Sequence, residues 1–269
     1  MAAPARLSSW LWALVFSLVL SLALSLVVGY GALLLGSLLP RLAGSLGAAS
    51  LVEALVYVSA SLFVVKRLDG RLASNLFGSE RPSAGALFAG AGLGLALHGP
   101  ADFVEAWVET WFPLPPSVTA ERIARLLPPT LAERATLLIC VAIIVPLVEE
   151  LFFRGALFAA LGRVAGVTAA LACSALAFTV SHAEPRSFAA LSLVAVVLGI
   201  LRLATGSLVP CLLLHASFNA TTLLLLFTGP GEIGPPRPSL PSFVVGSVLT
   251  ILFLILVMRQ SSREKASPA

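Results

Sequence analysis

The sequence predicts an all-α, polytopic integral membrane protein with about eight transmembrane helices around a polar cavity. Of the 269 residues, 58% are hydrophobic and only 11% are charged. Soluble domains carry about 25% charged residues, so the composition excludes an ordinary soluble protein. The formal net charge of +4 comes from basic residues scattered mainly near the ends of apolar segments. Such a distribution is typical of membrane topology signals and predicts no nucleic-acid partner.

Eight apolar segments mark the expected helices. Several are shorter than the ~20 residues that cross the hydrocarbon of a bilayer, so we expect them to extend into their flanks. They are residues 11–39, 48–65, 84–97, 137–153, 164–182, 188–203, 208–227 and 243–258.

Residues 1–269 are expected to form a single membrane domain at the cell membrane. In an eight-helix topology, eleven Lys and Arg residues fall on the side of the N-terminus and six on the other side. The positive-inside rule then predicts that both termini are cytoplasmic. The proline-rich stretch 101–134 contains a helix start at Thr119, which predicts a short amphipathic helix on the membrane surface. This helix is either a gate or a plain connector.

Three polar groups lie inside the fourth apolar segment. They are Glu149, Glu150 and Arg154. One ionised side chain at the bilayer centre costs ~2.5–3.5 kcal/mol on insertion scales, so the three predict a buried, mutually compensated site. Glu150 and Arg154 are four residues apart and can pair on one helix face, which leaves Glu149 free for chemistry. A single acidic residue near a segment start, Glu53, is interpreted instead as an interfacial or helix-dipole feature.

Two further motifs have the same four-residue spacing. Phe178 and His182 lie on the fifth segment, and His215 and Asn219 lie on the seventh. Residues four apart project from one face of a helix. Together with the charged group of the fourth segment they make three polar sets whose exposure to lipid is unfavourable. We therefore expect all three to face inward around a shared cavity.

A carboxylate, two imidazoles and an amide predict hydrolysis. A desolvated carboxylate can take a proton from water, with a neighbouring His to orient that water. A second His and an amide can stabilise an oxyanion. Neither HExxH nor GxSxG occurs. The sequence assigns no certain cofactor, and a zinc ion held by Glu149, His182 and His215 stays an open alternative to metal-free catalysis by glutamate.

At these residues the chain resembles the CPBP family of intramembrane proteases. This is the bacterial abortive-infection and CAAX-processing group, related to the eukaryotic Ras-converting enzyme of type II. The family pattern is EExxxR, FxxxH and HxxxN on successive helices. Here it reads 149-EELFFR-154, 178-FTVSH-182 and 215-HASFN-219. The resemblance covers about residues 135–228, the expected protease core.

The resemblance implies specific roles. Glu149 would be the catalytic base and His182 would help it to activate water. His215 and Asn219 would stabilise the oxyanion, with Glu150, Arg154 and Phe178 in support. The family cleaves near the C-termini of prenylated proteins, and bacterial members are linked to bacteriocin maturation and immunity and to processing of sorting tails. The implied activity is an intramembrane endopeptidase acting near the C-terminus of a membrane-associated protein or peptide.

Two other classes of function stay open. Intramembrane carboxylates and histidines also form proton relays, so a proton-coupled transporter is one alternative, although no inverted repeat is evident. A non-catalytic immunity or scaffold protein is the other.

Overall fold

The protein is built from helices, as the composition predicts. A computed structural model describes residues 7–42, 44–68, 76–78, 80–229 and 239–266. Within these ranges there is no strand, and only one isolated bridge pairs Gly78 with Ser207. The helices are α1 (Leu7–Leu38), α2 (Leu46–Leu68), α4 (Ala84–Ala96), α5 (His98–Trp111), α6 (Pro116–Leu126), α7 (Leu131–Ile139), α8 (Val145–Glu150), α9 (Phe158–Ala165), α10 (Val167–Ser181), α11 (Phe188–Thr205), α12 (Val209–Thr228) and α13 (Leu240–Ala266).

All eight predicted apolar segments are helical. In the described ranges, seven helices are long and apolar enough to cross a membrane. The eighth segment, α10, is apolar but has only 15 residues. The third segment is longer than predicted because α5 continues α4 into one stretch, Ala84–Trp111. The fourth extends in both directions to Leu131–Ala165, because a Thr130–Glu133 capping box starts α7 two turns before the apolar run.

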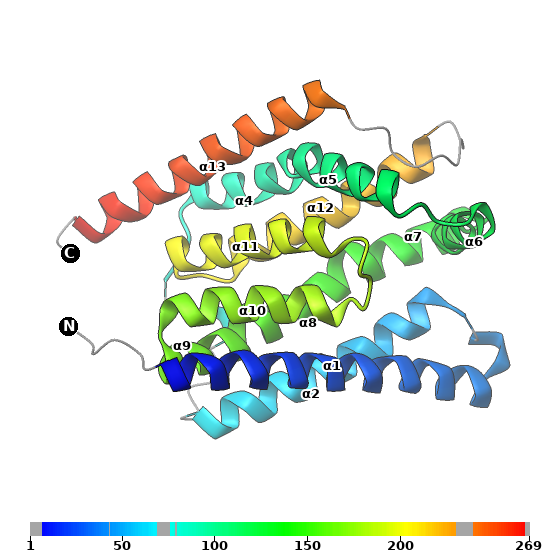
Figure 1. Cartoon of the computed structure of the whole chain (residues 1–269), viewed down its shortest axis with the longest axis horizontal. Helices are drawn as coiled ribbons and strands as arrows, with labels where there is room; N and C mark the ends of the chain where they lie inside the picture. Colours follow the sequence, from blue (N-terminus) through cyan, green and yellow to red (C-terminus); the bar gives the residue numbers. More distant parts are fainter. Residues whose placement is uncertain (1–6, 43, 69–75, 79, 230–238, 267–269) are drawn as a thin grey trace.

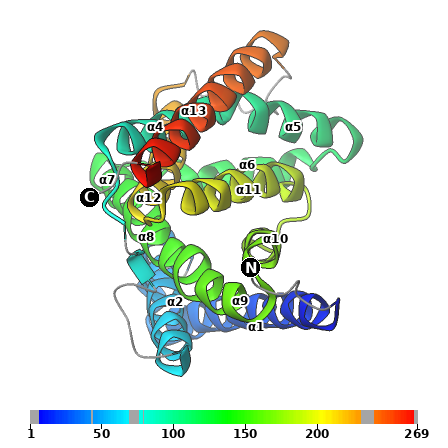
Figure 2. The same ribbon diagram turned by 90° about the vertical axis from the view of Figure 1, so that its left-hand side faces the viewer.

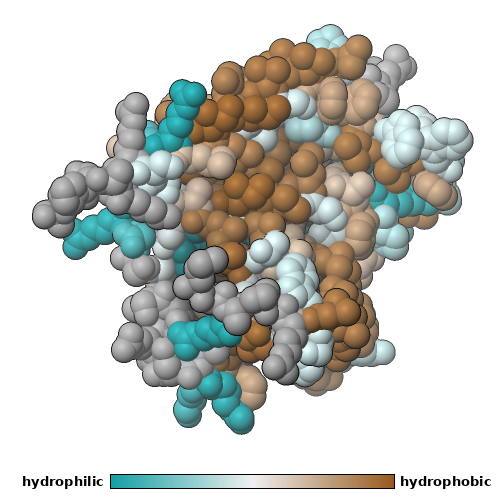
Figure 3. All heavy atoms as spheres, turned by 60° about the vertical axis from the view of Figure 1, so that its left-hand side comes forward, coloured by the Kyte–Doolittle hydropathy of each residue, from teal (hydrophilic) through white to brown (hydrophobic). Residues whose placement is uncertain are grey.

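The helices lie in a bundle with α1 and α2 on one side and α4, α5 and α13 on the other (Figures 1 and 2). Between them lie α8, α10, α11 and α12, which carry the polar motifs. The start of α1 and the end of α13 are at one end of the bundle, and α6 is at the opposite end (Figure 1). Hydrophobic residues cover most of the face in Figure 3, as expected of a surface that meets lipid.

The fourth segment is interrupted by two π-helical turns that no sequence pattern predicted. They span Cys140–Ile144 and Leu151–Leu157, directly before and after α8. A π turn inserts an extra residue and rotates the side chains that follow it, and such turns are frequent at functional sites. The first turn therefore sets the directions in which Glu149 and Glu150 point, and Arg154 lies within the second.

Two glycines bring α4 close to the helix that carries His215. Gly90 and Gly94 are four residues apart on one face of α4, and α4 packs extensively on α12. A Cβ at Gly90 would overlap the carbonyl oxygen of Pro210, and one at Gly94 would overlap Ser217 Oγ and Leu214 O. The backbone of α12 is therefore in direct contact with α4.

Replacing Gly94 with alanine is expected to lower the free energy of unfolding by about 1–3 kcal/mol, because the added methyl group overpacks the contact. This loss should exceed the gain of about 1 kcal/mol that alanine brings to a helix. Gly162→Ala is the matched control, because its Cβ would meet only Ala170 Cβ, at an ordinary 3.8 Å. Unfolding of the purified protein in detergent measures both. Equal stability of the two variants would contradict the packing argument.

Candidate active site

One cavity of 650 Å³ lies among the helices that carry the sequence motifs. Its lining comes from α1, α2, α5, α6, α8, α10, α11 and α12. Glu149, Phe178, His182, His215 and Asn219 all line it. The structure therefore brings together five of the seven residues predicted for the site, and the other two lie directly behind them.

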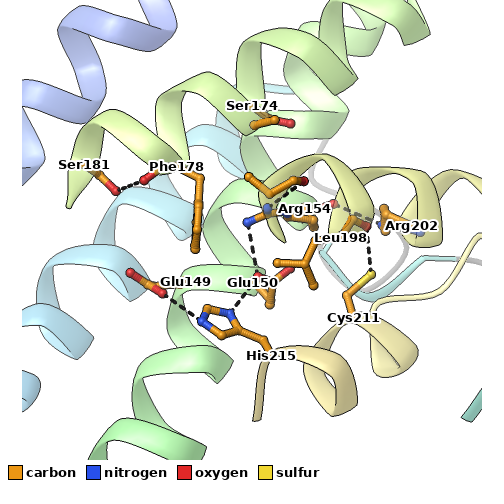
Figure 4. Close-up of polar contacts among 12 residues, drawn as sticks. Glu149, Glu150, Arg154, Ser174, Phe178, Ser181, Leu198, Arg202, Cys211 and His215 are labelled. Carbon is orange, nitrogen blue, oxygen red and sulfur yellow. Dashed lines mark hydrogen bonds and ion pairs between the residues drawn. The ribbon is translucent and has the colours of Figure 1, made fainter. Parts of the chain in front are cut away.

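Those two are Glu150 and Arg154, and they form the ion pair that their spacing predicts. Arg154 Nη1 donates to Glu150 Oε1 across 3.2 Å, and both side chains are 0% exposed. The same Glu150 oxygen accepts from His215 Nδ1 at 3.0 Å. Glu150 is thus held between a guanidinium and an imidazole from different helices (Figure 4). This chain of contacts ties α12 to the fourth segment.

Arg154 is fixed on several sides. Its Nη2 donates to the carbonyl oxygen of Ala195 at 3.1 Å, and its guanidinium lies 4.4 Å from the centre of the Phe178 ring. Its own carbonyl oxygen accepts from Arg202 Nε at 3.0 Å (Figure 4). The buried guanidinium is therefore paired, hydrogen-bonded and stacked, while its Nε has no hydrogen-bond partner among the described residues.

Glu149 faces both imidazoles. Its Oε1 is 4.0 Å from His182 Nε2, and its Oε2 is 3.6 Å from His215 Nε2. Both separations exceed a direct hydrogen bond. The carboxylate is almost fully buried, and Oε2 has no hydrogen-bond partner among the described residues. Glu149 therefore lines the cavity with one carboxylate oxygen that lacks a hydrogen-bond partner.

The two histidines are oriented by their Nδ1 atoms. His182 Nδ1 lies 2.8 Å from the carbonyl oxygen of Phe178, which can only accept a hydrogen bond. His215 Nδ1 lies beside the Glu150 carboxylate, which is also an acceptor. In both rings Nδ1 therefore carries a proton, and Nε2 is directed towards Glu149. The Phe178 ring packs between them, 4.6 Å and 5.6 Å from the two imidazole centres.

Asn219 lies one turn beyond His215 on the cavity side of α12. Its Nδ2 donates to the carbonyl oxygen of Val141, in the first π-helical turn, at 2.9 Å. An amide nitrogen has two hydrogens, so this bond orients the group and leaves the other N–H for a ligand.

The interpretation of Glu53 as an interfacial feature is wrong. Glu53 lines the cavity, and its carboxyl group is close enough to that of Glu149 for the two to interact. Two neighbouring carboxyl groups are placed most favourably when they hold a proton between them. One turn later, the buried Tyr57 also lines the cavity. The spacing of Glu53 and Tyr57, four residues apart in an apolar helix, was the signal that could have identified both.

The described residues contain no group of three or more His, Cys, Asp or Glu side chains placed to hold a metal ion. Glu149, His182 and His215 therefore do not fit the zinc alternative, so no step below is derived through a metal.

Comparison with known families identifies the part of the chain that carries the site. Residues 131–221 match the family model described as Rce1-like, type II CAAX prenyl endopeptidase. No curated protein and no solved structure matches the chain. The matched stretch contains all three sequence motifs and overlaps residues 135–228, on which the resemblance was based. The chain is therefore a multi-pass membrane protein with an Rce1-like domain of the CAAX protease family at residues 131–221.

Proposed function

We propose that the protein is an intramembrane endopeptidase in which Glu149 activates water for the hydrolysis of a peptide bond. The observation that carries the proposal is the buried Glu149 carboxylate, unpaired at Oε2 and directed into the cavity with an imidazole nitrogen on each side. The substrate is a membrane-associated protein or peptide, because the cavity lies among helices that meet lipid.

The reaction begins with water between Glu149 and His182. Glu149 accepts a proton from the water, and His182 Nε2, fixed by the bond from Nδ1 to Phe178 O, orients it. The oxygen attacks the peptide carbonyl carbon and forms a tetrahedral intermediate. Glu149 then passes the proton to the leaving nitrogen, the C–N bond breaks as the carbonyl re-forms, and the products are a carboxylic acid and an amine.

His215 and Asn219 are the donors to the oxyanion. Asn219 lies in the cavity wall with one amide N–H not used by the bond to Val141, and His215 lies one turn away on the same helix. The Nδ1–H of His215 already donates a hydrogen bond to Glu150. His215 therefore donates to the oxyanion from Nε2, which carries a proton when the ring is an imidazolium. That cation lies beside the Glu150 carboxylate and faces the oxyanion. Preorganised donors of this kind supply much of the rate enhancement in acyl transfer.

The test is cleavage of membrane-anchored peptides by the protein reconstituted in liposomes, followed by mass spectrometry. Wild type should cut and Glu149→Gln should not. Cleavage should persist after treatment with a chelator, because Glu149 and not a metal activates the water. Proton flux without any cleavage would sink the proposal and favour a carrier. Loss of cleavage on chelation, restored by zinc, would contradict the metal-free mechanism.

Both termini are proposed to be cytoplasmic. Arg154 was counted as a topology signal but is buried in the site. Of the other Lys and Arg residues that the structure describes, eight lie near helix ends on the side where α1 begins and α13 ends, and five lie on the α6 side. The positive-inside rule therefore directs α6 away from the cytoplasm.

A cysteine introduced at Ser117, on α6, is expected to react with a membrane-impermeant maleimide in intact cells. A cysteine at Ser262, near the end of α13, is expected to react only after permeabilisation, because it lies on the side of the termini. The three native cysteines are buried and should give little background. The reverse labelling pattern would overturn the assigned topology.

A further inference from the structure

One face of α2 borders the cavity, although α2 lies outside the matched residues 131–221. Its lining residues recur at helical spacing and are Leu46, Ala49, Ser50, Glu53 and Tyr57. Residues three and four apart share a face of a helix, so α2 presents one continuous face to the site. Glu53 is the carboxyl group on that face, and the mechanism proposed above does not use it.

The register of α2 beside the fourth segment is fixed by aromatic packing. Both run from the α6 end of the bundle towards the end where α1 begins, so they are parallel (Figure 1). The centre of the buried Tyr57 ring lies 5.3 Å from that of Phe152 and 5.5 Å from that of Phe153. About one turn earlier on the two parallel helices are Glu53 and Glu149, and α2 packs directly on α8. The same register therefore brings the two carboxyl groups together.

Two ionised carboxylates are unfavourable at this place. Glu149 is almost fully buried, and its carboxyl group and that of Glu53 are close enough to interact. The buried guanidinium of the site, Arg154, is already paired with Glu150. The helix on the other side of α2, α1, has no charged side chain. Like charges side by side in a buried site repel each other, so the Glu53–Glu149 pair holds one proton.

The surroundings of the pair favour the proton on Glu53. The other titratable groups that face Glu53 are the imidazoles of His182 and His215 and the phenol of Tyr57. Both imidazoles direct Nε2 at Glu149, at 4.0 Å and 3.6 Å. Glu149 must be ionised to take a proton from water, and a hydrogen bond from a neighbouring acid favours the ionised form.

We propose that Glu53 is a positioning residue, whose carboxylic acid donates a hydrogen bond to the Glu149 carboxylate and keeps that carboxylate ionised and oriented. The inference rests on the proposed function and adds a residue to it. The proton stays on Glu53 throughout. Glu149 still takes the proton from water and passes it to the leaving nitrogen, so the contribution of Glu53 falls on the chemical step and not on peptide binding.

Two substitutions at position 53 separate the hydrogen-bond donor from the space that it fills. Glu53→Gln keeps an N–H donor on a side chain of the same size, so it should retain most of the wild-type kcat. Glu53→Leu has no donor, so its kcat should fall by about 10- to 100-fold with KM little changed, as expected for one hydrogen bond to a charged group. Initial rates with a membrane-anchored peptide in liposomes measure both.

The matched control is Glu121→Gln, the same carboxyl-to-amide change at an exposed position of α6 outside the cavity lining, and it should cleave as wild type does. A folded Glu53→Leu protein that cleaves as fast as wild type would overturn the inference, because no donor would then be needed. Glu53→Gln as slow as Glu149→Gln would also overturn it, because Glu53 would then have to transfer its proton. The Glu53→Gln result decides alone if Glu53→Leu does not fold.

Infrared spectroscopy locates the proton without any substrate. The resting protein in nanodiscs should show the carbonyl stretch of a buried, protonated carboxyl group. This band should be absent from Glu53→Gln and present in Glu121→Gln. Loss of an ionised carboxylate band from Glu53→Gln instead would overturn the inference even if the protein cleaves peptides. Absence of cleavage by wild type would count against the proposed function and leave the infrared result unchanged, so the two failures are distinguishable.

Discussion

Replacing Glu149 with glutamine is expected to lower the kcat of peptide cleavage by about 10²- to 10⁴-fold, the range that a positioned acid–base group contributes. Glutamine has the same size and can keep the contact with Glu53, but it cannot take a proton from water. The loss should fall on kcat with KM little changed, because the proton transfer is made only on the way to the transition state. Initial rates with a membrane-anchored peptide in liposomes measure it.

A matched substitution separates chemistry from folding. Glu121 on α6 is exposed and paired with Arg125, outside the cavity lining, so Glu121→Gln should cleave as wild type does. Thermal unfolding in detergent should show that Glu149→Gln is still folded. If the folded Glu149→Gln protein kept more than about a tenth of the wild-type rate, Glu149 would not be the base.

The parts of the site that could be predicted from sequence are those set by local spacing. Residues four apart in a helix share a face whatever surrounds them, so the Glu150–Arg154 pair followed from the sequence alone. The inward turn of His215 and Asn219 followed from the rejection of polar groups by lipid. The eight apolar segments could be located for a related reason. A segment inside lipid must satisfy its own backbone hydrogen bonds, and a helix does so.

The parts that could not be predicted depend on contacts between distant segments. His215 Nδ1 bonds to Glu150 across 65 residues of sequence, and no local pattern names that partner. Glu53 was misinterpreted because one carboxylate near a helix start is usually interfacial, and only the packing of α2 beside α8 brings it to Glu149. The π-helical turns leave no mark in hydropathy, because one inserted residue does not interrupt an apolar run.

The largest expected effect on stability comes from replacing Arg154 with methionine. Methionine fills much of the volume beside Phe178 but leaves Glu150 buried without the guanidinium. Removing one partner of a buried ion pair costs about 3–5 kcal/mol, because the remaining charge is uncompensated. The free energy of unfolding, measured by SDS titration in mixed micelles, should fall by that amount. An exposed arginine on the side of the termini, Arg81, is the matched control, and Arg81→Met should change it by no more than about 0.5 kcal/mol.

A second substitution tests the cause of that loss. Adding Glu150→Gln to Arg154→Met removes the orphaned carboxylate, so the double variant should be more stable than Arg154→Met alone. It should still cleave poorly, because glutamine cannot hold His215 Nδ1 as a carboxylate does, and the imidazolium needed for oxyanion donation loses its counter-charge. A double variant that is no more stable than Arg154→Met would show that the loss comes from packing against Phe178. In that case the Glu150–Arg154 pair would contribute to catalysis through position and not through charge balance.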